Sequence, residues 1–226
     1  MGAIMSITSS AALAAIIDHT ILRPDATEAE IDQFCAEALQ WQFASVCVNP
    51  LNIPRVAATL RGTPVKTCSV VGFPLGAMPT DLKRREVEWV VAKGAAEVDM
   101  VISIGTLKSV GAGPIGEEIG VLKTACGTAL LKVILETSLL TDEEIVSASL
   151  AAKTAGADFV KTSTGFTQKG ATVEAVALMR RTVGLGMGVK ASGGIRSFAE
   201  AMAMVEAGAT RIGTSRGVAL MREAHF

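Results

Sequence analysis

The sequence has no tyrosine, and aromatic residues make up only 4% of its 226 positions. So few rings leave little surface on which nucleic-acid bases could stack. The formal net charge of -1 at pH 7 also gives no positive field that would attract nucleic acid or an anionic membrane. We therefore expect neither nucleic acid nor a membrane as a partner.

Patterns typical of metal sites and of organic cofactors are also missing. The four cysteines lie far apart and form no Cys-x-x-Cys pair, which argues against a zinc ribbon or a thioredoxin-type motif. The two histidines, His19 and His225, are too distant in sequence to suggest a metal site. No Gly-x-Gly-x-x-Gly follows the first predicted strand, which weakens a dinucleotide-binding interpretation. We expect no cofactor and no metal, and cysteines that act as small apolar fillers in the cytosol.

The uncharged run over residues 1–17 invites comparison with a targeting segment. It lacks the basic residues that begin a signal peptide, and serine and threonine interrupt its apolar character. It is also too short and too polar to span a bilayer. We expect neither a leader nor a membrane span.

Strand-like and helix-like segments alternate along the chain. Helices are predicted over 27–40, 53–60, 81–93, 116–127, 142–155, 172–183 and 197–207, with a last one from 215, and Thr27 and Glu30 form a capping-box signature. Strands are predicted over 45–48, 65–71, 131–136 and 210–213, around Asp99, Lys161 and Lys190, and in the apolar run from 11 to 17 that ends in Asp18-His19-Thr20. About eight such units favour one closed parallel α/β barrel, a single (β/α)8 or TIM barrel domain over residues 1–226.

An internal repeat relates three of the strands. A glycine closes a helix at positions 94, 156 and 208, and five residues after each one stand Asp99, Lys161 and Gly213. We expect these three positions to be structurally equivalent and to face the barrel interior. Since side chains alternate along a strand, Glu97 and Arg211 should also point inward, toward the floor of the barrel.

The chemistry centres on Lys161, which ends an apolar strand and opens into a hydroxyl-rich turn at 162–166. A lysine at a strand end often only extends its ammonium into water. Lys190 ends another strand in the same way and Asp99 lies on a third, so the three residues form a constellation. An amine attacks a carbonyl only in its neutral form, and two lysines in one cleft titrate as a coupled pair in which one amine stays neutral.

Two segments carry a family resemblance: Lys-Thr-Ser-Thr-Gly-Phe at 161–166 and Lys-Ala-Ser-Gly-Gly-Ile-Arg at 190–196. They resemble the deoxyribose-phosphate aldolase family, class I aldolases on a TIM barrel, and the similarity extends over nearly the whole chain. The resemblance implies reversible cleavage of 2-deoxy-D-ribose 5-phosphate to D-glyceraldehyde 3-phosphate and acetaldehyde through a Schiff base on Lys161, in deoxyribonucleoside catabolism. It also implies that Asp99 and Lys190 move protons, and that the protein forms a homodimer or homotetramer.

Substrate-binding residues follow from the same resemblance and from the positions of the loops. Contacts with the phosphosugar and aldehyde are expected from Asp18, Thr20, Cys47, Thr164 and Gly165. The phosphate is expected at the loops after the last two strands, where barrels present backbone N–H groups to anions, with Gly193, Gly194, Ile195, Arg196, Gly213 and Ser215 as the contacts.

The sequence departs from the family pattern at two positions. Phe166 stands where some relatives carry a lysine, and Arg216 could compensate for that charge. The tyrosine that some relatives place near the C-terminus as a proton relay is missing, and His225 is a candidate substitute.

Three other functions stay open at this level. Another Schiff-base aldolase could act on a ketose phosphate, because two lysines alone do not fix the carbonyl donor. A phosphosugar isomerase would need a general base such as glutamate in place of Lys161. A non-catalytic sugar-phosphate-binding barrel would tolerate Lys161→Ala.

Overall fold

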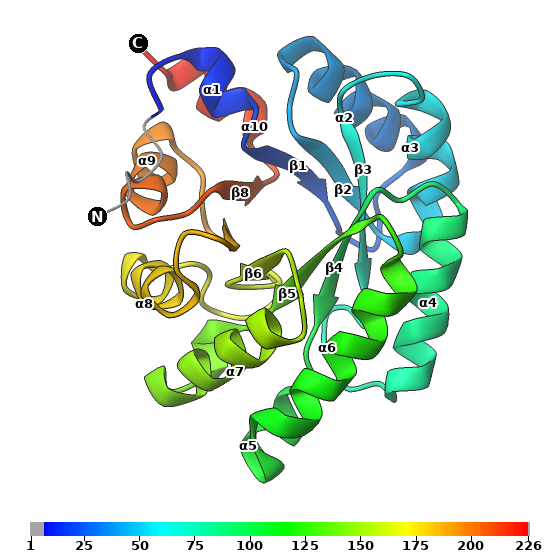
Figure 1. Cartoon of the computed structure of the whole chain (residues 1–226). Coiled ribbons are helices and arrows are strands. Elements are labelled where there is room, and N and C mark those ends of the chain that lie inside the picture. Colours follow the sequence, from blue (N-terminus) through cyan, green and yellow to red (C-terminus); the bar gives the residue numbers. More distant parts are fainter. Residues whose placement is uncertain (1–6, 226) are drawn as a thin grey trace.

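The structure is a computed structural model that describes residues 7–225. Its centre is a closed barrel of eight strands, in which each strand pairs in parallel with the next and β8 pairs with β1. The strands are β1 (Ile17–Ile21), β2 (Ser45–Val48), β3 (Lys66–Val71), β4 (Glu97–Val101), β5 (Leu130–Ile134), β6 (Phe159–Lys161), β7 (Gly188–Ser192) and β8 (Arg211–Thr214). Figure 1 shows the strands gathered in the middle with the helices around them. The predicted (β/α)8 fold is confirmed.

Ten α-helices and two short 3-10 helices connect the strands within the described residues. They are α1 (Ser10–Ala14), α2 (Glu28–Trp41), η1 (Pro50–Asn52), α3 (Ile53–Thr59), α4 (Thr80–Ala92), α5 (Ile104–Val110), α6 (Ala112–Cys126), η2 (Thr137–Leu139), α7 (Asp142–Thr154), α8 (Val173–Val183), α9 (Phe198–Glu206) and α10 (Gly217–Glu223). The predicted capping box of Thr27 and Glu30 is present, and Thr141 and Ser197 start α7 and α9 in the same way. Apolar faces of these helices pack on the barrel and form the main core.

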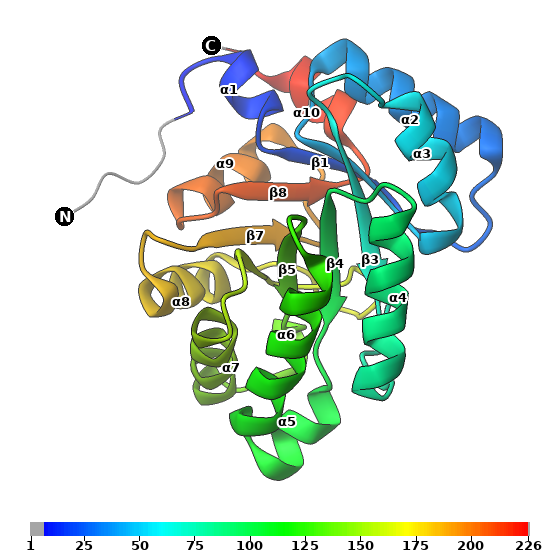
Figure 2. The ribbon, with the colours of Figure 1, turned by 45° about the vertical axis from the view of Figure 1, so that its right-hand side comes forward.

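Three element predictions need correction. The apolar run over 11–17 is not one strand, because Ser9 accepts a hydrogen bond from the Ala12 N–H and starts the short helix α1; alanine-rich sequence favours that helix, and β1 begins only at Ile17. Helix α5 was not predicted. The last helix begins at Gly217, two residues later than expected. Figure 2 shows α1 beside α10, so the first and last helices meet.

Inward-pointing side chains form layers, each supplied by alternate strands. The strand register places Cys47, Asp99, Lys161 and Gly213 in one layer, Asp18, Cys68, Lys132 and Lys190 in the layer beneath it, and Ser45, Glu97, Phe159 and Arg211 at the floor. The three positions predicted from the glycine repeat therefore share a layer. Gly213 is needed there because a Cβ atom would lie 3.0 Å from both Lys190 Cε and Ser192 Cβ.

No helix within residues 7–225 combines the length and the apolar character needed to cross a membrane.

Candidate active site

Three lysines from consecutive strands meet around one aspartate inside the barrel. Asp99 Oδ2 lies 2.7 Å from the Nζ atoms of both Lys161 and Lys190, and Asp99 Oδ1 lies 2.7 Å from Lys132 Nζ. All four side chains are buried. The structure therefore brings together the three predicted catalytic residues and adds a lysine that the sequence interpretation missed.

A second carboxylate and the floor of the barrel complete this group. Asp18 Oδ2 lies 2.5 Å from Lys190 Nζ, and its Oδ1 accepts hydrogen bonds from Arg211 at 2.6 Å and from Ser45 Oγ at 2.6 Å. Arg211 also contacts Glu97 at 3.1 Å, and Glu97 lies 2.6 Å from Lys132. The predicted inward direction of Glu97 and Arg211 is confirmed.

We call these seven side chains the charge cluster; they are Asp18, Glu97, Asp99, Lys132, Lys161, Lys190 and Arg211. The cluster contains three acidic and four basic groups, so it holds one basic group more than it can neutralise. Charges attract and repel strongly in a buried environment, so the stability of these groups depends on the balance of charge among them.

Asp18, Asp99 and the two deeper lysines, Lys132 and Lys190, hold their charges firmly. Burial alone would raise the pKa of Asp18, but Lys190 and Arg211 outweigh burial and lower this pKa well below its ordinary value. The pKa of Asp99 is lowered in the same way, against burial, by the three lysines. Burial would lower the pKa of Lys190, yet Asp18 and Asp99 raise it well above its ordinary value, and Asp99 does the same for Lys132. Both deeper lysines are therefore ammonium ions at neutral pH.

Lys161 differs from the other two lysines in its ion pairs. Within residues 7–225 its one carboxylate contact is Asp99 Oδ2, which it shares with Lys190, whereas Lys190 also pairs with Asp18 and Lys132 also pairs with Glu97. The sequence interpretation placed Lys190 against Lys161 as a bare neighbouring cation. The structure instead places the Asp99 carboxylate between them, 2.7 Å from both Nζ atoms.

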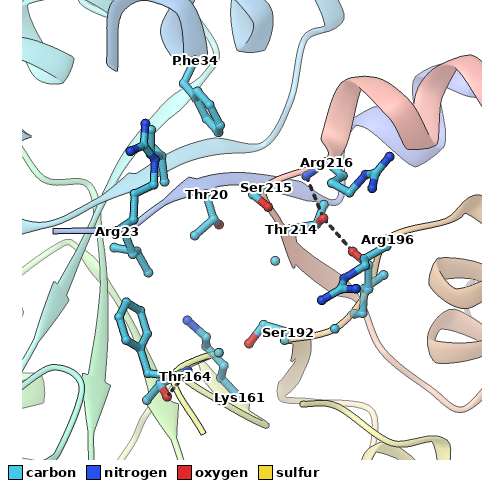
Figure 3. Close-up of a pocket in the computed structure, with 18 of the residues that line it drawn as sticks. Thr20, Arg23, Phe34, Lys161, Thr164, Ser192, Arg196, Thr214, Ser215 and Arg216 are labelled. Carbon is cyan, nitrogen blue, oxygen red and sulfur yellow. Dashed lines mark hydrogen bonds between the residues drawn. The ribbon is translucent and has the colours of Figure 1, made fainter. Parts of the chain in front are cut away.

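A cavity of about 490 Å³ opens above Lys161 at the C-terminal ends of the strands. In Figure 3 the lysine side chain rises toward this cavity from below, with Thr20 above it and Ser192 beside it. Phe166 forms part of the wall and contacts Phe73 edge to face, with ring centroids 5.2 Å apart. The cavity is therefore partly apolar and has an amine at its base.

One side of the cavity is basic and has exposed backbone. Arg196 and Arg216 lie on this side in Figure 3. Thr214 ties the loop after β7 to the loop after β8. Its hydroxyl donates to the Ile195 carbonyl at 2.8 Å and accepts from the Arg216 N–H at 3.0 Å. Gly193 and Gly194 have φ values of +87° and +80°, which residues other than glycine rarely adopt.

The predicted substrate-binding residues occupy different depths. Most of them line the cavity, namely Thr20, Thr164, Gly165, Gly193, Gly194, Ile195, Arg196, Gly213 and Ser215. Asp18 and Cys47 do not line it and are fully buried in the interior layers. A hydrogen bond with Cys68 lowers the pKa of the Cys47 thiol. His225 is exposed and lies outside the cavity lining.

Sequence reasoning missed several side chains of the site. Lys132 is a charged residue in an otherwise apolar strand, and this was the signal that could have revealed it. Arg23 and Phe34 line the cavity from the segment after β1. Ser192 donates to the Ser163 carbonyl at 2.6 Å and so ties the loop after β6 to the end of β7.

Ligand atoms of Cys47, Cys68 and Asp99 lie close enough together to hold a metal ion. Their surroundings do not suit a cation, because Lys132 Nζ lies 2.7 Å from Asp99 Oδ1 and 3.3 Å from Cys68 Sγ. Asp99 thus serves the charge cluster, and the two thiols lie beside it.

A (β/α)8 barrel with a buried lysine at the base of its C-terminal cavity, next to a carboxylate and a second lysine, has the architecture of a class I aldolase. The model of the DeoC/LacD family aldolases matches residues 12–226. The chain belongs to this family.

Curated relatives and solved structures agree with that assignment. The chain is 58% identical to the deoxyribose-phosphate aldolase of Rhodospirillum rubrum over 215 residues, which cover 95% of this chain and 90% of that protein. It is 55% identical to the corresponding protein of Brevibacillus brevis, with coverage of 91% and 93%. A crystal structure described as a putative deoxyribose-phosphate aldolase from Coccidioides immitis superposes with a TM-score of 0.93 at 41% identity, covering 97% of this chain and 88% of that one. The tetrameric deoxyribose phosphate aldolase of Aeropyrum pernix gives 0.88 at 38% identity, with coverage of 95% and 91%.

Proposed function

We propose that this aldolase reversibly cleaves 2-deoxy-D-ribose 5-phosphate to D-glyceraldehyde 3-phosphate and acetaldehyde, within the catabolism of deoxyribonucleosides. The observation that carries the proposal is the Nζ atom of Lys161, which lies at the base of the cavity 2.7 Å from Asp99 Oδ2. The names of the relatives reported above indicate the substrate, and the charge cluster places a carboxylate and a second lysine beside this amine.

The first chemical step is addition of the Lys161 amine to the aldehyde carbon of the open-chain sugar. The carbinolamine loses its hydroxyl as water, after protonation, and becomes an iminium ion. This step needs a base that takes a proton from the nitrogen and an acid that gives one to the leaving hydroxyl, both within hydrogen-bond reach. Asp99, which contacts both Lys161 and Lys190, is placed to accept the proton from the nitrogen and to pass a proton, with water and Lys190, to that hydroxyl.

The iminium then draws electrons from the bond between the second and third sugar carbons. That bond breaks, its electron pair forms an enamine with the former iminium carbon, and the proton of the third-carbon hydroxyl passes to a base as glyceraldehyde 3-phosphate forms. Protonation of the enamine carbon and addition of water to the resulting iminium release acetaldehyde and the free lysine. Asp99, with water, and Lys190 carry these protons in the proposal, so no tyrosine is needed.

The phosphate would bind on the basic side of the cavity. Arg196 and Arg216 supply positive charge there, and Gly193, Gly194 and Ser215 supply backbone N–H groups. This arrangement supports the role of Arg216 as a substitute for the lysine that Phe166 replaces.

Cleavage of the phosphosugar by purified protein tests the proposal. Production of glyceraldehyde 3-phosphate would be followed with a coupled dehydrogenase assay, using wild-type protein, Lys161→Ala and the matched control Lys169→Ala, an exposed lysine in the same loop. We expect turnover by wild type and by the control, and none by Lys161→Ala. Turnover by Lys161→Ala that equals wild type would overturn the proposal.

Borohydride reduction in the presence of either acetaldehyde or dihydroxyacetone phosphate separates this activity from a ketose-phosphate aldolase. Acetaldehyde should be the donor that becomes fixed to the protein, because the proposed enamine has two carbons. Fixation of dihydroxyacetone phosphate alone would favour the rival activity.

Assembly and location complete the proposal. We propose a homodimer or homotetramer, supported by the tetrameric relative from Aeropyrum pernix and testable by light scattering on the purified protein. We propose a cytosolic location, supported by four cysteines that are unpaired and buried, as is usual in reducing compartments.

A further inference from the structure

Glu136 follows the end of β5 and is buried, with 1% of its surface exposed. It takes no part in the chemistry proposed above. Its carboxylate accepts three hydrogen bonds, all from the loop that follows Lys161. Oε2 accepts from the Thr164 hydroxyl at 2.5 Å and from the Thr164 N–H at 3.2 Å, and Oε1 accepts from the Thr167 hydroxyl at 3.1 Å.

The backbone of Glu136 is also unusual. Its φ and ψ values are 58° and 60°, the left-handed conformation, which only one other non-glycine residue among the described positions shares. A residue with a Cβ atom is disfavoured there, and such conformations persist where surrounding contacts hold them. The adjacent Thr137 N–H donates to the Thr162 carbonyl at 2.9 Å. The strained residue is thus fixed directly against the loop.

The loop that Glu136 holds is a wall of the cavity. Thr164, Gly165 and Phe166 all line it. The hydrogen bonds continue beyond the carboxylate, because the Thr164 hydroxyl that donates to Glu136 also accepts from the Phe166 N–H at 3.1 Å. Figure 3 shows Thr164 with this hydrogen bond next to Lys161. One buried carboxylate therefore fixes the course of the backbone from Thr164 to Phe166.

No ion pair of Glu136 is found within residues 7–225. Its carboxylate is satisfied by N–H and O–H donors alone, so the contacts require acceptor oxygens in the right places and do not require a cation. An amide of the same shape can supply one acceptor oxygen, and the Thr167 hydroxyl can rotate to accept from the amide nitrogen. Glu136→Gln keeps the shape of the side chain and removes its charge, so this variant tests which of the two the loop requires.

We infer that Glu136 is a positioning residue that sets the affinity for the phosphorylated substrate by holding the Thr164–Phe166 wall in its binding shape. The inference rests on the proposed function. Lys161 itself is held by the strand ladder between β5, β6 and β7, so the amine should keep its place when the wall relaxes. The effect should consequently fall on binding of the sugar phosphate and spare attack on a small aldehyde.

The test compares Glu136→Ala, Glu136→Gln and Thr167→Val with wild type; Thr167 donates to the same carboxylate at 3.1 Å but does not line the cavity. Glu144→Gln is the matched control, because Glu144 also accepts from a threonine N–H, at 2.9 Å, but caps α7 away from the cavity. Two quantities are measured for each protein: KM and kcat for cleavage of 2-deoxyribose 5-phosphate, and the rate at which borohydride fixes acetaldehyde to Lys161. Circular dichroism confirms folding.

When the wall loses its hydrogen bonds to the charged Glu136 carboxylate, the affinity for the sugar phosphate should fall by about tenfold or more. We expect Glu136→Ala and Thr167→Val to raise KM for the phosphosugar by about tenfold or more, with kcat and acetaldehyde fixation within about threefold of wild type. Glu136→Gln should recover most of the affinity, and Glu144→Gln should match wild type.

Two results would overturn the inference. Either KM for the phosphosugar stays unchanged in both Glu136→Ala and Thr167→Val, or acetaldehyde fixation falls in the same proportion as phosphosugar cleavage. If Glu136→Ala does not fold, Thr167→Val, which lacks only the hydroxyl, decides the question. Wild-type protein that fixes no acetaldehyde would instead refute the proposed function, an outcome visible without any variant.

Discussion

Removing one anion from the charge cluster should destabilise the protein more than removing one cation. Asp18→Asn leaves the cluster with four basic and two acidic groups, and it takes the carboxylate away from Lys190, at 2.5 Å, and from Arg211, at 2.6 Å. Lys132→Met removes the ammonium group, keeps an unbranched apolar side chain that is one atom shorter, and leaves three groups of each sign. Each change takes one charge out of the barrel interior, so the difference in stability reports the balance of charge.

The magnitudes follow from the burial of the cluster. Breaking a buried ion pair by removing one partner costs about 3–5 kcal/mol. Both changes break such pairs, because Lys132 also contacts Asp99 at 2.7 Å and Glu97 at 2.6 Å, but Lys132→Met leaves the charge cluster balanced and Asp18→Asn does not. For a protein of this size, 1 kcal/mol corresponds to about 2–4 °C in Tm. Each change should therefore lower Tm by about 6–20 °C, with the larger loss in Asp18→Asn.

Differential scanning fluorimetry at pH 7 measures both changes. Asp32→Asn is the control, because Asp32 pairs with Arg55 on the surface, and exposed pairs contribute about 1 kcal/mol or less. A larger loss of Tm in Lys132→Met than in Asp18→Asn would refute the reasoning that the cluster carries an excess of positive charge.

The remaining predictions concern activity and pH. Lys190→Met should lower kcat by about 10²–10⁴-fold, the usual contribution of a proton-transfer group, in the coupled cleavage assay, and activity near wild type would contradict its role. Gly213→Ala should lower kcat because the added Cβ displaces Lys190, whose Cε would lie 3.0 Å away; a crystal structure of the variant with Lys190 unmoved would argue otherwise. Arg216→Met should raise KM for the phosphosugar by about tenfold or more, while KM for unphosphorylated 2-deoxyribose stays the same. The fold lowers the pKa of Asp18, so its contribution to stability is present above about pH 4 and is lost as the pH falls further. The Tm difference between wild type and Asp18→Asn should accordingly shrink in acid, and a difference that grows would be inconsistent with this sign.

Much of the fold could be predicted because local signals agree with it. Alternating apolar segments and the capping box at Thr27 define helices and strands without reference to the rest of the chain. The glycine repeat also predicted that Asp99 and Lys161 occupy equivalent positions facing the barrel interior. The short helix α1 was missed because the same alanine-rich run suits either a buried strand or a helix, and the cap at Ser9 decides between them.

The parts of the site that could not be predicted depend on contacts between distant segments. The three lysines around Asp99 come from β5, β6 and β7, and only the closed barrel shows that Lys132 reaches the same carboxylate as Lys161. The sequence indicated two lysines that repel one another. The carboxylate between Lys161 and Lys190, and the second carboxylate at Asp18, depend on the strand register and could not be read from spacing alone.

Glu136 illustrates the same limit. In the sequence it is an acidic residue at the end of a predicted strand, with nothing to distinguish it from a solvated one. Its left-handed backbone and its hydrogen bonds to Thr164 and Thr167 appear only in the folded chain.

The most direct test of the central claim is peptide mapping after borohydride reduction with acetaldehyde. The claim is that the amine of Lys161, at the base of the cavity beside Asp99, is the nucleophile. The account predicts a single ethyl group on the peptide that contains Lys161, and none on the peptides that contain Lys132 or Lys190. An ethyl group on either of those lysines, with Lys161 unmodified, would contradict it.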